Sequence, residues 1–327
     1  MSKIRVKIVL FSILVLFFLS CNKDTEGVNE YDIESSSRKM SIFVAVTRES
    51  NIAAYSKDGI KWTETRMPSI AKWISLVYGK GKFVAVTRES NIAAYSKDGI
   101  KWTETRMPSI AKWISMTYGN DKFVAVASNT NKAAYSEDGI KWIETTMIES
   151  APWVRVCYGK DKFITLACES SIAAYSKDGI KWGKTTTLPN EAYCYSVTYG
   201  KGKFAAVVYY SNKGAYSEDG IKWVETGMIS KEDWKLIDWV DICYGNGMFV
   251  AIAYESNIAA YSEDGIKWQV AILPEKKNWI RVCYGNGMFV AIAYESNIAA
   301  YSKDGVKWTE TRMPSVAKWA NICYGGD

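Results

Sequence analysis

Short apolar runs alternate with polar turns along most of this chain. Within residues 73–108, runs rich in aromatic, β-branched and small apolar residues cover 73–78, 83–86, 92–95 and 100–105. Glycine, asparagine, aspartate and serine stand between the runs, which is typical of short strands joined by tight turns. We therefore predict four antiparallel strands in this segment, connected as consecutive hairpins.

The same unit recurs, and its most regular part is the phrase Tyr-Ser-(Lys/Glu)-Asp-Gly-(Ile/Val)-Lys-Trp. The seven copies begin at Tyr55, Tyr95, Tyr135, Tyr175, Tyr216, Tyr261 and Tyr301. Successive copies are 40, 40, 40, 41, 45 and 40 residues apart. A period of this length, with several short strands in each repeat, indicates a β-propeller. We expect an all-β, seven-bladed propeller of four-stranded antiparallel blades over residues 41–327.

The two ends of the repeat array complement each other. The first repeat, 43–65, has only the last three strands of the unit, whereas residues 319–325 form a first strand with no others after it. We expect the C-terminal strand to complete the N-terminal blade, because this pairing closes the ring and leaves no unpaired edge there.

The turn phrase has a physical role of its own. Ser56 and Asp58 are placed to hydrogen-bond the backbone of their turn, and Trp62 is placed to fold over the hairpin. The phrase resembles the Asp-box, the bacterial neuraminidase repeat of sialidase-type propellers, whose form is Ser-x-Asp-x-Gly-x-x-Trp; here Asp and Gly are adjacent. The resemblance implies that the phrase joins the third and fourth strands of each blade. It also implies a structural aspartate in each copy: Asp58, Asp98, Asp138, Asp178, Asp219, Asp264 and Asp304.

The N-terminal segment has a different character. Residues 1–21 begin with three basic side chains, continue as an uncharged apolar run over 8–19 and end in Ser20-Cys21. The run is shorter than a comfortable membrane span and fits the apolar core of a secretory signal. Its end resembles the lipobox of bacterial lipoproteins, which implies lipidation of Cys21; an ordinary signal peptide is the alternative. We expect residues 22–40 to be a flexible tether, and the protein to be exported and lipid-anchored at the outer membrane or cell surface.

Charge argues against one class of partner. Lysine and arginine number 41 and aspartate and glutamate 35, which gives a formal net charge of +6. Loss of residues 1–21 removes three cations and no acid, leaving +6 − 3 = +3. The lysines recur in every repeat and are therefore spread around the ring, whereas nucleic-acid binding needs a clustered basic face. We expect no nucleic-acid partner.

Histidine is absent from the sequence. This excludes Ser-His-Asp and Cys-His catalytic systems and histidine zinc sites. One carboxylate in each turn is too few oxygen ligands for calcium, so we expect no metal and no cofactor. The sialidase resemblance would imply three arginines, a Tyr–Glu pair and an acidic Asp, but most arginines here are copies at equivalent positions of different repeats. We therefore expect that the protein is not an enzyme, with a sialidase-like glycoside hydrolase as the alternative.

The candidate binding residues lie in the second turn of the unit, between its second and third strands. Antiparallel strands place this turn and the links between blades on one face, and the phrase and the glycine-rich first turn on the other. Aromatic rings beside charged groups on such a rim suit sugar rings or a protein partner, although they are also compatible with ordinary solvated turns. The candidates are Arg48, Arg88, Tyr209, Tyr210, Tyr254, Glu255, Tyr294, Glu295 and, in a link, Trp234. Trp234 is either a ligand platform or a lid packed on the rim.

These patterns favour a monomeric, non-catalytic binding module on a cell-envelope lipoprotein. Its ligand would be a glycan or an envelope or host protein, held adhesin-like by multivalent contacts from similar turns. An assembly or scaffold factor for an envelope protein complex is a further alternative, since propellers with related boxes also serve as assembly chaperones.

Overall fold

The computed structural model describes residues 41–168, 170–185, 188, 194–229 and 237–326. Residues 39–327 form one compact unit. The predicted signal segment, Cys21, the tether and Trp234 lie outside the described residues. In the described ranges all regular secondary structure is β, and no helix there is long and apolar enough to cross a membrane.

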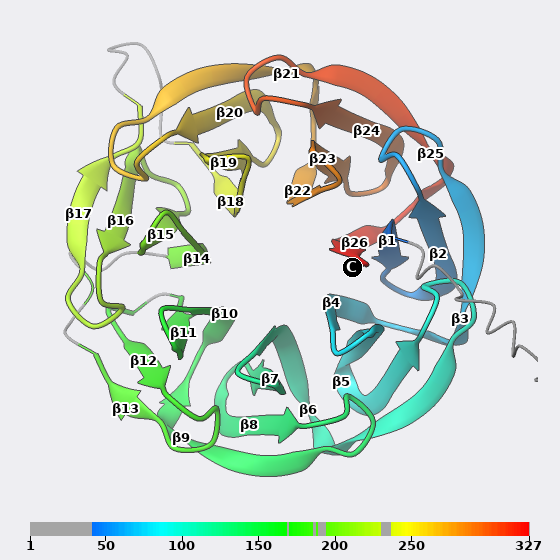
Figure 1. The fold of residues 1–327 in the computed structure, drawn as a ribbon, viewed down its shortest axis with the longest axis vertical. Coiled ribbons are helices and arrows are strands. Elements are labelled where there is room, and N and C mark those ends of the chain that lie inside the picture. The colour runs from blue at the N-terminus through cyan, green and yellow to red at the C-terminus, as the bar shows by residue number, and fades with distance from the viewer. Residues whose placement is uncertain (1–40, 169, 186–187, 189–193, 230–236, 327) are drawn as a thin grey trace, which may run out of the picture. The chain divides into compact units, whose positions relative to one another are not determined.

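The strands form radial sheets whose first strands lie innermost and whose fourth strands lie outermost (Figure 1). One sheet combines the first and last strands of the propeller. It consists of β26 (Trp319–Gly325), β1 (Ile42–Thr47), β2 (Ser50–Ser56) and β3 (Thr63–Ala71). The next sheet has six strands, namely β4 (Trp73–Gly79), β5 (Lys82–Ser96), β6 (Thr103–Gly119), β7 (Lys122–Ala127), β8 (Thr130–Ser136) and β9 (Ile143–Ala151).

Four further sheets have four antiparallel strands each. The first two contain β10 (Trp153–Gly159), β11 (Lys162–Ala167), β12 (Ala173–Ser176) and β13 (Gly183–Lys184), then β14 (Cys194–Gly200), β15 (Lys203–Val208), β16 (Lys213–Ser217) and β17 (Val224–Gly227). The other two contain β18 (Trp239–Gly245), β19 (Met248–Ala253), β20 (Ser256–Ser262) and β21 (Gln269–Lys277), then β22 (Trp279–Gly285), β23 (Met288–Ala293), β24 (Ser296–Ser302) and β25 (Thr309–Ala317).

Backbone pairing therefore gives six sheets, and the prediction of seven separate four-stranded blades is wrong. With each continuous sheet counted as one blade, the propeller has six blades. The reason lies in two long strands. β5 continues through a second turn and β6 continues through a link between repeats, because Arg88 pairs with Lys112 and Ser90 pairs with Ala111. The copies of the phrase that begin at Tyr95 and Tyr135 consequently share one sheet, so seven sequence repeats are distributed over six sheets.

The predicted closure of the ring is confirmed. β26 pairs antiparallel with β1, with Val44 opposite Cys323 and Phe43 opposite Tyr324. The closing strand also contacts the next sheet, since the Asn321 side chain donates a hydrogen bond to the Ile74 carbonyl at 3.1 Å. The two ends of the repeat array therefore stabilise each other through backbone pairing and side-chain contacts.

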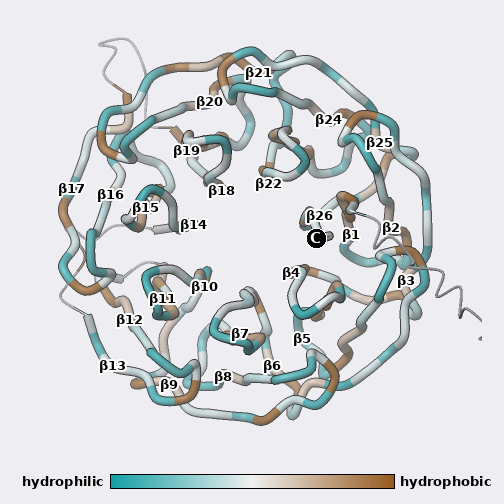
Figure 2. Tube along the Cα trace, viewed as in Figure 1, coloured by the Kyte–Doolittle hydropathy of each residue, from teal (hydrophilic) through white to brown (hydrophobic). Residues whose placement is uncertain are grey.

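Large apolar side chains fill the space between neighbouring sheets. The tryptophans that begin six first strands are fully buried: Trp73, Trp113, Trp153, Trp239, Trp279 and Trp319. Each first strand ends in a Tyr-Gly pair, and a Cβ on Gly79 would overlap the ring of Tyr118 in the following repeat. The same contact joins Gly325 to Tyr78 and thus crosses the closure. Figure 2 shows apolar and polar residues interspersed around the whole ring, as expected for strands that bury alternate side chains.

The turns sort onto two faces as the strand directions require. Lys80 and Lys82, beside the first turn, donate hydrogen bonds to the carbonyls of Glu137 and Asp138 in the phrase of the next repeat. On the other face, the backbone N–H of Tyr254 donates to the carbonyl of Asp238 at 2.8 Å, which ties a second turn to a link.

The seven turns of the phrase, which we name the box turns, share one hydrogen-bond pattern. In the first, the Gly59 N–H donates to Ser56 Oγ at 2.9 Å, and the N–H groups of Ile60 and Lys61 donate to Asp58 Oδ1 at 2.9 and 2.8 Å. Gly59 has a φ of 73°, which a residue with a Cβ rarely adopts. Burial alone would raise the pKa of Asp58, but these backbone hydrogen bonds and one from Ser56 hold it below its ordinary value.

Candidate functional site

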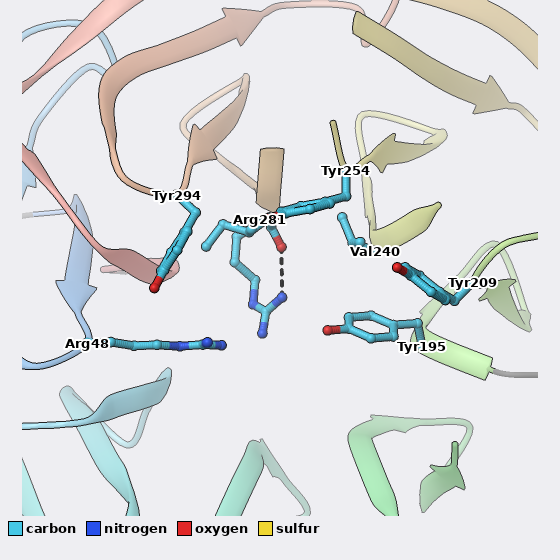
Figure 3. Close-up of a pocket in the computed structure, with 8 residues that line it drawn as sticks. Arg48, Tyr195, Tyr209, Val240, Tyr254, Arg281 and Tyr294 are labelled. Carbon is cyan, nitrogen blue, oxygen red and sulfur yellow. Dashed lines mark hydrogen bonds between the residues drawn. The ribbon is translucent and has the colours of Figure 1, made fainter. Parts of the chain in front are cut away.

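A cavity of about 360 Å³ opens at the inner ends of four sheets, on the face that carries the second turns (Figure 3). Second turns contribute Arg48, Tyr209, Tyr254 and Tyr294 to its lining. Inner strands contribute Tyr195 from β14, Val240 from β18, and Ile280 and Arg281 from β22. The cavity thus combines four phenol rings and two guanidinium groups from distant parts of the sequence.

The structure brings together some of the candidate residues and separates others. Arg88 lines a smaller neighbouring cavity of about 100 Å³. Tyr210 is 62% exposed and lies outside the lining of both cavities. Glu255 and Glu295 are exposed and occupy left-handed turn positions with φ values of 47° and 51°, so they lie on the rim. Trp234 lies outside the described residues.

Sequence reasoning missed the lining residues that come from inner strands. Tyr195 and Arg281 belong to the first strands β14 and β22, from which no candidate residue was predicted. The signal was present in the position two residues after the first-strand tryptophan. Three of the six such positions hold serine or asparagine, whereas the other three hold a charged residue: Arg155, Asp241 and Arg281. A charged side chain on the innermost strand therefore distinguished these three repeats from the others.

One of these charges is fully paired. Asp241 Oδ1 accepts hydrogen bonds from Arg155 Nη2 at 2.7 Å and from Ser196 Oγ at 2.8 Å, while Oδ2 accepts the backbone N–H of Val282 at 3.0 Å. The side chains of Arg155 and Asp241 are only 13% and 8% exposed. This cluster links four sheets next to the cavity and satisfies the aspartate with three donors.

Arg281 is different, because it has no salt bridge to any carboxylate in the described residues. Its Nη1 donates to the carbonyl of Ile280 at 2.7 Å, and its buried Nε has no hydrogen-bond partner among the described residues. Burial, and secondarily the charge of Arg155, lowers the pKa of Arg281 to about 9, so the side chain remains a cation at neutral pH. Figure 3 shows its guanidinium at the centre of the cavity, with Arg48 and Tyr195 on either side.

Arg48 also lacks a salt bridge to a carboxylate in the part of the chain that the structure describes. Its guanidinium carbon lies 5.8 Å from the centroid of the Tyr294 ring, within the range of a cation–π interaction. On the opposite wall, the rings of Tyr195 and Tyr209 lie 5.6 Å apart. The cavity therefore has an aromatic wall on each side of a cationic centre.

Acidic groups surround the cavity without entering its lining. Burial raises the pKa of Asp238, the nearby Tyr209 hydroxyl opposes this increase, and the charge of Glu255 adds to it. Burial and the charge of Glu255 likewise raise the pKa of Tyr254, so its phenol stays protonated. The hydroxyls of Tyr209 and Tyr254 consequently act as neutral hydrogen-bond donors and acceptors at neutral pH.

The described residues contain no group of three histidine, cysteine or acidic side chains that could hold a metal ion. Their free cysteines include Cys157, Cys243, Cys283 and Cys323, whose pKa values burial raises well above the ordinary range. Such thiols are poor nucleophiles. The lining of the cavity thus offers aromatic, cationic and hydroxyl groups.

No family model matches the sequence, and no curated protein matches it. Among solved structures, virginiamycin B lyase from Staphylococcus aureus is similar with a TM-score of 0.66 and 16% identity, covering 74% of this chain and 85% of that one. YCF48 bound to a D1 peptide is similar with a TM-score of 0.59 and 12% identity, covering 84% and 88%. Apo AztD from Citrobacter koseri has a TM-score of 0.53 and 10% identity, covering 88% and 98%. These similarities establish the propeller fold.

Proposed function

We propose that this protein is a non-catalytic binding module whose ligand site is the cavity between Arg48, Arg281 and the four tyrosines. The observation that carries the proposal is the convergence of these unlike residues, each from a different turn or inner strand, on one cavity. A volume of about 360 Å³ falls within the range of small-ligand pockets, at its lower end. We therefore propose a single composite site in place of the multivalent contacts from similar turns that the sequence suggested.

A glycan is the ligand class that we favour. Tyrosine rings offer flat apolar surfaces for the faces of sugar rings, and their hydroxyls offer hydrogen bonds to sugar hydroxyls. The cavity has such rings on two opposite walls. A peptide ligand is the competing possibility, and the YCF48 structure with a D1 peptide is an example of a similar fold that binds one.

Two observations argue against catalysis. A histidine-to-alanine form of virginiamycin B lyase is catalytically inactive, whereas this chain contains no histidine at all. A carboxylate-pair hydrolase would need two acids at the reacting bond, and none of the lining residues is acidic. The proposed module therefore holds its ligand without transforming it.

The proposed setting is the bacterial cell envelope. The basic start, the short apolar run and Ser20-Cys21 support export and lipidation of Cys21, which would hold the propeller at a membrane surface. Mass spectrometry of the mature protein tests this directly: a diacylated N-terminal cysteine is expected, and an unmodified Cys21 inside an intact leader would refute it.

A glycan array probed with the full chain in detergent tests the binding proposal. The Tyr254→Ala/Tyr294→Ala double variant should lose glycan binding and keep its unfolding midpoint. Tyr210→Ala is the matched control, since Tyr210 lies in the same kind of turn but outside the cavity lining, and it should bind like the original protein. Equal binding by all three proteins would place the site elsewhere, and no binding to any glycan would reject this ligand class.

A further inference from the structure

The charges around the cavity do not balance, and this imbalance indicates what the ligand carries. Three charged side chains stand at equivalent inner-strand positions: Arg155, Asp241 and Arg281. Asp241 is committed to Arg155 at 2.7 Å, to Ser196 and to the backbone of Val282. Arg281 therefore has no salt bridge of its own among the described residues, and its positive charge lies beside that of Arg155.

A second uncompensated cation faces the first. Arg48 lines the same cavity and contacts the Tyr294 ring, without a salt bridge to a described carboxylate. The buried Nε atoms of both arginines lack hydrogen-bond partners among the described residues. A buried donor without a partner is unfavourable, and a partly desolvated guanidinium gains most from a planar anion that accepts two hydrogen bonds.

We infer that the cavity recognises a ligand through a carboxylate placed between Arg281 and Arg48, and that the ligand is an acidic sugar. The inference rests on the proposed function and names its ligand class. The carboxylate supplies the missing negative charge, while the tyrosines on either side contact the ring that bears it. A neutral sugar of the same shape would leave both guanidinium groups unpaired.

The acidic rim limits how much negative charge the ligand carries. Glu255 and Glu295 are exposed at the mouth, and Asp238 is close enough to Tyr209 for its charge to add to the effect of burial in raising the pKa of that phenol. Lys318 neutralises part of this rim, with Nζ at 2.6 Å from Glu49 and 3.9 Å from Glu295. An extended polyanion would meet these carboxylates, whereas a single carboxylate that reaches the centre of the cavity would avoid them.

Calorimetry with a matched pair of sugars tests the inference. Methyl β-glucuronide and methyl β-glucoside differ only in a carboxylate in place of a hydroxymethyl group. The full chain in detergent should bind the glucuronide about 10-fold to 100-fold more tightly, as expected for charge-assisted hydrogen bonds. Arg281→Gln should abolish this preference, and Arg281→Lys should retain part of it. Arg66→Gln, which changes an exposed arginine outside the cavity lining, should leave the preference unchanged.

The outcomes separate the two proposals. Equal affinity for the two sugars, both lost in Tyr254→Ala/Tyr294→Ala, would overturn the inference and leave the glycan site in place. Binding of neither sugar, with binding of a short peptide that depends on its free C-terminal carboxylate, would overturn the acidic-sugar assignment and the glycan proposal together. If Arg281→Gln lowers the unfolding midpoint, Arg48→Gln provides the same test from the opposite side of the cavity.

Discussion

Replacing Trp319 with alanine measures how firmly the C-terminal strand closes the ring. Trp319 begins β26, is fully buried, and donates its indole N–H to the Ser315 carbonyl at 3.3 Å. Truncating a fully buried tryptophan lowers the free energy of unfolding by about 3–5 kcal/mol, because less apolar surface is removed from water and a cavity remains in the core. For a domain of this size each kcal/mol lowers the unfolding midpoint by about 2 °C, so a decrease of roughly 6–10 °C is expected.

Trp279→Ala is the matched control for this prediction. Trp279 begins β22, is equally buried, and donates its indole N–H to the Glu275 carbonyl at 3.1 Å, but its sheet is continuous in sequence. Thermal unfolding followed by circular dichroism should give similar decreases for the two variants. A decrease for Trp319→Ala of less than about a third of that for Trp279→Ala would show that the closing strand frays, and would refute the closure as a source of stability.

Deletion of residues 319–327 is the stronger form of the same test. The deletion removes the partner of β1 and exposes roughly 500 Å² of apolar surface, which corresponds to about 12 kcal/mol. This is comparable to the whole stability of a typical domain, so the shortened chain should unfold or aggregate. An unchanged unfolding midpoint would contradict the closure.

Four further predictions concern the turns and the buried charges. Asp58→Ala removes the acceptor of two backbone N–H groups and should cost about 1–2 kcal/mol in urea unfolding, while Asp58→Asn should cost less. The pKa values of all seven box aspartates are lowered in the folded state. Their contribution to the free energy of unfolding is therefore complete above the ordinary pKa of 3.8 and is lost as pH falls through the folded pKa values. Urea midpoints that do not decrease from pH 6 to pH 3 would contradict this. Asp241→Asn leaves Arg155 buried without its counter-ion and should lower the free energy of unfolding by about 3–5 kcal/mol. Adding Arg155→Met to the same chain should recover part of that loss. Additive effects of the two changes would argue against the pairing. Lys201→Asn, at a φ of 47° before Gly202, creates the Asn-Gly turn present at Asn246 and should raise stability by about 0.5 kcal/mol, whereas a decrease would show that the lysine makes contacts of its own.

Much of the fold was predictable because it depends on local chemistry repeated many times. The first strand expected over 73–78 is observed as β4, Trp73–Gly79, and the sorting of turns onto two faces follows from strand direction. The closing strand was predictable because each end of the repeat array lacks what the other end has. The number of separate sheets was not predictable from the sequence. The continuity of β5 depends on backbone hydrogen bonds around Arg88, and the sequence around Arg88 is the same as that around Arg48 in the first repeat.

The proposed binding cavity was predictable only in part. Arg48, Tyr209, Tyr254 and Tyr294 stood out because the second turns vary between repeats. The contribution of Arg281 depends on distances across the ring, since its charge matters only once Asp241 is known to be occupied by Arg155, 86 residues away in sequence. Such a pairing joins two repeats that are not consecutive, and the repeat pattern carries no information about it.

A crystal structure of the protein with methyl β-glucuronide tests the account most directly. We predict the sugar ring between the tyrosine walls of the cavity, with its carboxylate hydrogen-bonded to the guanidinium groups of Arg281 and Arg48. Sugar bound on the face of the box turns, or an empty cavity at a concentration that saturates binding in solution, would contradict it.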